Sequence, residues 1–119
     1  MEAITPRPNP GQWLSATVVR IIDGDTLQAD IDLGLGIHYI RSCRIRGYDS
    51  PELNSPRHID ALKAQDTLAD LLPPGKVFAI LSPSWQLDRY ARVIGDWYTL
   101  DGFLIRDMLP QEYTTERRP

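Results

Sequence analysis

Residues 26–33 alternate strictly between apolar and polar side chains. This period of two predicts a β-strand with one face toward a core and the other toward solvent. Turn signals lie on both sides of it, Asp23-Gly24 before and Gly34-Leu35-Gly36 after, so the neighbouring strands are expected to pair with it antiparallel. The sequence therefore predicts a three-stranded meander made of Leu14–Ile22, Thr26–Leu33 and Ile37–Arg46.

The rest of the chain adds a helix and two further strands. Apolar residues recur at helical spacing after Ser55-Pro56, a helix-start signal, and this recurrence stops at Pro73-Pro74-Gly75. We expect two more strands and a short second helix, at Lys76–Leu81, Arg92–Leu100 and Phe103–Leu109. This order predicts an α+β protein that is mainly β: a five-stranded OB-type barrel, a small closed sheet, with two packed helices.

The chain has 119 residues, 42% of them hydrophobic, which is enough for one domain with a single core. We expect residues 1–13, with three prolines, to form an extended arm, residues 14–113 the folded domain, and residues 114–119 a flexible tail. Neither a bilayer-spanning apolar run nor the apolar segment of a signal peptide is visible, which favours a cytoplasmic protein without membrane contact. The one cysteine, Cys43, fits a reducing compartment and is expected to be buried.

The formal net charge is −3, so the molecule as a whole lacks the positive field of a protein that binds nucleic acid through charge alone. The charges are nevertheless uneven along the chain. Aspartates cluster around the first turn, and arginines cluster in two later segments. Any polyanionic ligand must therefore be held locally, at a site.

Two acidic motifs follow strands that a meander brings to the same end of the sheet: Asp23-Gly24-Asp25-Thr26 after the first and Asp49-Ser50-Pro51-Glu52 after the third. Taken singly, each is more often a turn than a site. Together, carboxylates about 4 Å apart repel by about 1 kcal/mol in water and about 4 kcal/mol at an effective dielectric constant near 20. A bound cation relieves this repulsion. Oxygen ligands without cysteine or paired histidines favour calcium or magnesium.

Three blocks of the sequence, VVRIIDGDTL, RIRGYDSPEL and DRYARV, resemble in order and spacing those of staphylococcal nuclease-like (thermonuclease) proteins. The resemblance runs from about Thr17 to Leu109. It implies an OB barrel and calcium-dependent hydrolysis of phosphodiester bonds in DNA and RNA, leaving 3′-phosphate ends. The partner expected from it is nucleic acid, single-stranded DNA or RNA, bound by a monomer.

The same resemblance implies a metal site. Asp25 and Asp49 match the carboxylates that bind calcium directly, and Ser50 matches a position that contributes its main-chain carbonyl. Asp23 matches an aspartate that reaches the ion through water. Magnesium is the other candidate cation.

The resemblance also implies catalytic and substrate-binding residues. Glu52 matches the general base that activates water, and Arg44 and Arg92 match the arginines that bind the scissile phosphate. Forked, permanently charged guanidinium groups suit the negative charge that builds on the phosphate oxygens during hydrolysis. Arg89 and Tyr90 match a pair that contacts the terminal phosphate of a bound nucleotide.

The sequence departs from the family pattern in four places. One of them is the loop between Glu52 and the helix, which is shorter than in the secreted nucleases. Ser50 replaces a threonine, which matters little where only a main-chain oxygen is needed. Ala91 replaces the glycine before Arg92, so a positive φ there would strain the backbone. The chain also stops soon after its expected second helix, so few phosphates can be neutralised outside the site; this predicts weak nucleic-acid binding with a shallow slope of log affinity against log salt.

Two other functions stay open from the residues alone. One is a noncatalytic module of the same fold that binds nucleic acid or a protein. The other is an unrelated small barrel in which the acidic turn is purely structural. Retention of all five residues that catalysis needs favours the nuclease: Arg44, Glu52, Arg92, Asp25 and Asp49.

Overall fold

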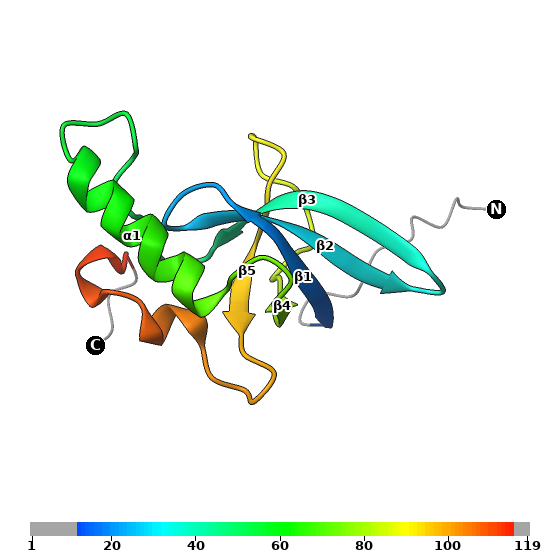
Figure 1. Cartoon of the computed structure of the whole chain (residues 1–119). Helices are drawn as coiled ribbons and strands as arrows, with labels where there is room; N and C mark the ends of the chain where they lie inside the picture. Colours follow the sequence, from blue (N-terminus) through cyan, green and yellow to red (C-terminus); the bar gives the residue numbers. More distant parts are fainter. Residues whose placement is uncertain (1–11, 116–119) are drawn as a thin grey trace.

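The computed structural model describes residues 12–115, which form a closed barrel of five β-strands with one α-helix. The strands are β1 (Trp13–Ile21), β2 (Thr26–Gly34), β3 (Ile37–Ile45), β4 (Val77–Leu81) and β5 (Val93–Tyr98). Their order around the barrel is β1-β2-β3-β5-β4, and β4 closes on β1. Helix α1 (His58–Leu71) and two short 3-10 helices, η1 (Ile105–Met108) and η2 (Gln111–Tyr113), gather at one end (Figure 1).

The predicted meander is confirmed. β1 pairs antiparallel with β2 and β2 with β3, whereas β3 and β5 run parallel. The strict alternation in β2 has the expected cause, because Leu27, Ala29 and Ile31 are fully buried inside the barrel while the residues between them face outward. The structure is thus a mainly β barrel, compatible with the OB type.

Apolar side chains from all five strands fill the barrel interior. Trp97 and Phe78 are fully buried, and their ring centroids lie 5.6 Å apart. Cys43 is also buried, as expected from the sequence. Burial raises the pKa of its thiol to about 12, so this cysteine stays protonated and unreactive at neutral pH.

Helix α1 begins later than the sequence indicated. Ser55 does not cap it: the Ser55 hydroxyl donates to the Glu52 carbonyl at 2.7 Å and accepts from the Arg57 backbone N–H at 3.2 Å, which stabilises the preceding loop. The helix starts at His58 and ends before the predicted Pro73 stop. Its buried residues, Ala61, Ala64 and Leu68, recur at helical spacing and face the barrel.

The expected second packed helix over Phe103–Leu109 is not what the structure contains. Only the 3-10 turn η1 forms there. Its Ile105 is buried in the core, and the buried Arg106 donates through Nη1 to the Arg46 carbonyl at 2.8 Å. Four residues suffice to make these two contacts, and the next residues, Leu109-Pro110, return to extended backbone.

Glycine at position 24 is required by close packing rather than by backbone conformation. Gly24 is not among the glycines with positive φ, although the sequence suggested a hairpin turn of that kind. A Cβ added there would lie 2.6 Å from Ala64 Cβ and 2.9 Å from Ser50 Oγ. The turn between β1 and β2 therefore lies directly against α1, and glycine permits this approach.

The ends of the described segment are tied to the barrel. Trp13, which the sequence placed in the arm, already belongs to β1 and lies edge-on to Tyr98 with ring centroids 4.5 Å apart. At the other end, the Thr115 N–H donates to the Gly47 carbonyl at 2.9 Å. The rest of the expected arm and tail lies outside the described residues. Within residues 12–115, no helix is long and apolar enough to span a membrane.

Candidate functional site

One small cleft collects most of the residues that the sequence motifs single out. It lies where the β1–β2 turn, the end of β3 with the segment after it, and the residue before β5 meet. Its lining residues are Asp23, Asp25, Arg44, Asp49, Ser50, Pro51, Glu52 and Arg92. Seven of the nine predicted site residues are thus brought together. Arg89 and Tyr90 do not line the cleft.

The Asp25 carboxylate is buried and held by two hydrogen bonds. Thr26 Oγ1 donates to Asp25 Oδ1 at 2.7 Å, and the Ser50 backbone N–H donates to Oδ2 at 3.1 Å. The Ile45 N–H donates to the Asp25 carbonyl at 3.0 Å. These contacts join the turn after β1 to the segment after β3, and they fix the direction in which this carboxylate points.

Arg44 lies between two carboxylates of the cleft. Its Nη2 donates to Asp49 Oδ1 at 3.0 Å and lies 3.9 Å from Asp25 Oδ2. The two carboxylate oxygens are therefore no more than about 7 Å apart, the sum of these distances. Asp25 is nearly buried whereas the Asp49 side chain is 64% exposed, so Asp49 is the partner that can move.

The cleft carries an excess of negative charge. Four carboxylates and two guanidinium groups give its lining a formal charge of −2. Burial and the charges of Asp25 and Glu52 raise the pKa of Asp23, and Arg92 opposes this only in part. The cleft therefore attracts cations more strongly than anions.

The donor set fits a hard cation. Every side-chain ligand in the cleft is a carboxylate or hydroxyl oxygen, the chemistry that calcium and magnesium prefer. Among residues 12–115, however, no three His, Cys, Asp or Glu side chains converge closely enough to hold a metal ion as they stand. Arg44 takes the place between Asp25 and Asp49, so a cation shared by these two must displace it.

Arg92 is oriented by Asp88, a residue to which the sequence motifs assign no role. Arg92 Nε and Nη2 both lie 2.9 Å from Asp88 Oδ2, while Asp88 Oδ1 accepts the backbone N–H groups of Tyr90 and Arg92 at 2.9 Å each. Burial raises the pKa of Asp88, but the hydrogen bonds from Arg92 and Tyr90, together with the positive charge of Arg92, outweigh burial and leave the pKa below its usual value. The signal was present, since Asp88 is the first residue of the Asp-x-Tyr-x-Arg block.

Arg89 and Tyr90 form an exposed group next to Arg92. The Tyr90 ring is 63% exposed, and the guanidinium carbons of Arg89 and Arg92 lie 4.9 and 5.0 Å from its centroid. Such cation–π contacts orient flexible arginines and are modestly stabilising. Through Arg92, this group is continuous with the cleft.

Ala91, which stands where the family pattern has glycine, adopts a positive φ of 59°. Alanine in the left-handed region costs about 1–2 kcal/mol relative to glycine, partly offset by the freedom glycine adds to the unfolded chain. We expect Ala91→Gly to raise the free energy of unfolding by about 1 kcal/mol, measured by urea denaturation. Ala79→Gly, in regular strand β4, is the matched control and should lower it. A loss of stability in Ala91→Gly would contradict the assigned strain.

In comparisons with known proteins, the chain matches no family model and no curated protein.

Proposed function

We propose that this chain is a metal-dependent nuclease of the staphylococcal nuclease-like type, built on an OB-type barrel, which hydrolyses phosphodiester bonds in DNA, RNA or both. The observation that carries the proposal is one cleft lined by four carboxylates and two arginines from three separate segments. Calcium is the expected cation and magnesium the second candidate. The expected substrate is single-stranded nucleic acid.

Charge balance supports a cation as part of this site. A phosphodiester brings a further negative charge to a lining whose formal charge is already −2. One divalent cation neutralises that lining and leaves the arginines to attract the phosphate. Asp25 and Asp49, with the main-chain carbonyl of Ser50, would hold the cation, and Asp23 would reach it through water. When bound, the cation supplies positive charge to the reacting phosphate.

The two arginines and the glutamate have distinct roles in this proposal. Arg44, released from the carboxylates, and Arg92, held by Asp88, bind the phosphate oxygens where negative charge develops during hydrolysis. Glu52, exposed at the rim of the same cleft, accepts the proton of the attacking water. Arg89 and Tyr90, outside the cleft, contact the adjoining part of the substrate.

The proposal is tested by incubating the purified protein with single-stranded DNA and with RNA, in calcium, in magnesium and in EDTA. We expect cleavage that requires the divalent cation and that falls roughly 10²–10⁴-fold in Glu52→Gln, because a general base contributes about that factor. Glu112→Gln, at an exposed glutamate in η2 outside the cleft, is the matched control and should retain full activity.

Two outcomes would decide against the nuclease. Nucleic acid that binds to saturation without being cleaved in calcium or magnesium would favour the alternative, a noncatalytic binding module of the same fold. Cleavage that persists equally in EDTA and in Glu52→Gln would place the activity outside this cleft.

A further inference from the structure

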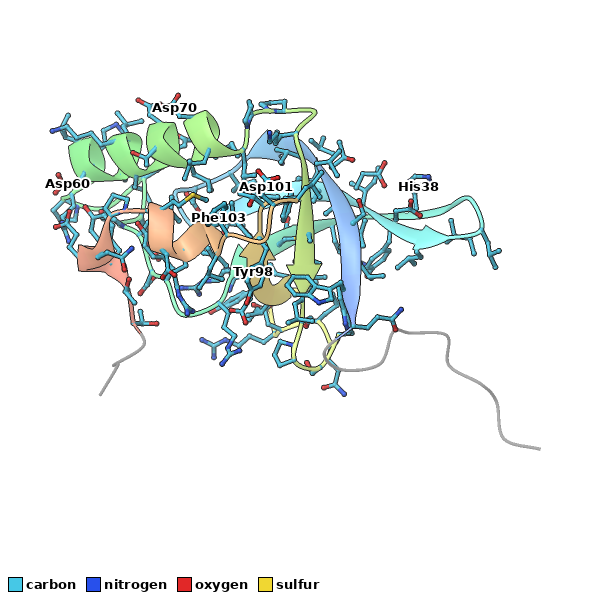
Figure 2. All side chains as sticks on the ribbon, turned by 90° about the horizontal axis from the view of Figure 1, so that it is seen from below. His38, Asp60, Asp70, Tyr98, Asp101 and Phe103 are labelled. Atoms are coloured by element: carbon cyan, nitrogen blue, oxygen red, sulfur yellow. The ribbon has the colours of Figure 1, made fainter. Side chains whose placement is uncertain are left out.

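The outer half of β3 has an unpaired edge. β3 pairs with β5 only through Cys43–Ile45, whereas β2 pairs with β3 along its whole length. Residues 37–42 therefore have β2 on one side and, within residues 12–115, no strand on the other. This part of the β2–β3 hairpin projects beyond the barrel on the side away from α1 (Figure 1), and Figure 2 shows His38 on it.

Backbone alternation decides which groups face that edge. The Ile45 N–H donates toward β2, to the Asp25 carbonyl, and the Arg46 N–H donates toward β5, to the Gly95 carbonyl. The pairing with β2 inserts no extra residue in β3 itself. The backbone N–H and C=O groups of the even-numbered residues of β3 therefore point away from β2 throughout. The N–H and C=O groups of His38, Ile40 and Ser42 are thus presented outward.

Such an edge readily accepts another strand. β3 carries no proline, and the only register shift of the hairpin lies near its tip, between Asp32 and Gly34. The hairpin also exposes apolar side chains: Leu33 is 42%, Ile37 55% and Leu35 100% exposed. These features favour a protein partner. A nucleic acid is disfavoured because β2 places Asp30 and Asp32 across from Ile40 and His38, against one permanent positive charge, Arg41, on this part of β3.

We propose that this edge pairs antiparallel with the same edge of a second copy of the chain, with Ile40 on the two-fold axis. This register pairs every outward residue, since Ile40 faces its own counterpart and His38 faces Ser42 of the second copy. Each such pair exchanges both backbone hydrogen bonds. If the second copy is moved along the edge by one strand repeat in either direction, one residue whose backbone groups face outward is left without a partner. One of these shifts also sets Arg41 against Arg41, and the other sets Tyr39 against Tyr39.

The side chains agree with this register. Ile40 is 55% exposed, and pairing brings two such residues together on one face. On the other face, Tyr39 lies opposite Arg41 of the second copy. The same two residue types already contact each other within the chain. Arg41 Nε donates to Tyr39 Oη at 2.6 Å, and the Arg41 guanidinium carbon lies 4.9 Å from the Tyr39 ring centroid. No like charges face each other. The proposed two-fold dimer differs from the monomer that the family resemblance implies, and it does not depend on the proposed catalysis.

Sedimentation equilibrium of the full chain over a wide concentration range tests the proposal. We expect a reversible dimer whose dissociation constant rises roughly tenfold or more in Ile40→Lys and in Ile40→Glu, because like charges then meet on the axis. An equimolar mixture of the two variants should dimerise again, since opposite charges then face each other. Leu100→Lys, at a residue 69% exposed outside the hairpin, is the matched control and should dimerise like the unmodified chain.

Each result bears on a separate part of the proposal. A chain that stays monomeric at every concentration would overturn the dimer. Dimers equally strong in Ile40→Lys would overturn the edge as the interface, and variants that fail to associate when mixed would overturn the register with Ile40 on the axis. Circular dichroism verifies that each variant is folded, which is expected because the Ile40 side chain is mostly exposed.

Discussion

Replacing Arg44 with alanine is expected to lower the rate of cation-dependent cleavage by roughly 10²–10³-fold, the usual loss when one donor to a developing negative charge is removed. Arg44 lines the cleft and is one of the two guanidinium groups available to a phosphate there. Arg44→Lys should recover only part of the rate, because lysine keeps the charge but lacks the fork that binds two oxygens. Single-turnover cleavage of a labelled oligonucleotide measures the effect.

The same substitution should leave calcium binding as tight as before, or make it tighter. Arg44 Nη2 lies 3.0 Å from Asp49 and 3.9 Å from Asp25, so its positive charge competes with any cation for these carboxylates. Isothermal titration with calcium tests this. Arg57→Ala, which removes an exposed arginine paired with Asp60 on α1, is the matched control for both measurements. Weaker calcium binding in Arg44→Ala, or an unchanged rate, would contradict the assigned role.

Gly24→Ala should be the most destabilising single-methyl change in the site region. Its new Cβ would lie 2.6 Å from Ala64 Cβ and 3.0 Å from the Ala64 carbonyl carbon, so α1 or the turn must shift. Such overpacking costs about 1–3 kcal/mol of the free energy of unfolding. Urea denaturation measures it. Because Asp23 and Asp25 flank the glycine, cleavage should fall as well.

A double-mutant cycle assigns the cause. Ala64→Gly alone should cost about 1 kcal/mol, as glycine does inside a helix. In that background, Gly24→Ala should be less harmful than in the unmodified chain, since the closest clashing atom is gone. Additive losses would show that the two positions do not collide, and the close packing of α1 on the turn would then not explain the glycine.

The local sequence pattern was sufficient to predict the meander, because β2 has one buried and one outward face and its apolar and polar side chains alternate accordingly. It was insufficient for η1, where contacts of Ile105 with the core and of Arg106 with the end of β3 decide the conformation. The start of α1 was misplaced for a similar reason. The Ser55 hydroxyl donates a hydrogen bond to the preceding loop, and a Ser-Pro sequence alone does not distinguish this arrangement from a helix cap.

Seven of the predicted site residues line one cleft, but the contacts among them do not follow from the sequence. A meander brings the ends of β1 and β3 together, so the convergence of Asp25 and Asp49 follows from topology. The position of Arg44 between them depends on side-chain directions across three segments, which spacing does not encode. Asp88 was passed over because its partner, Arg92, was assigned to phosphate alone.

β3 is one uninterrupted strand that carries both the free edge and Arg44. Arg44 and Ile40 are both even-numbered, so their side chains project from the same face of the sheet. In the proposed pair, both clefts would therefore open on one side of a continuous sheet. Eight residues of extended chain, at most about 27 Å, would separate them along the strands. A dimer built in this way could hold two points of one nucleic-acid molecule at once, and the hairpin would set the spacing between its cuts.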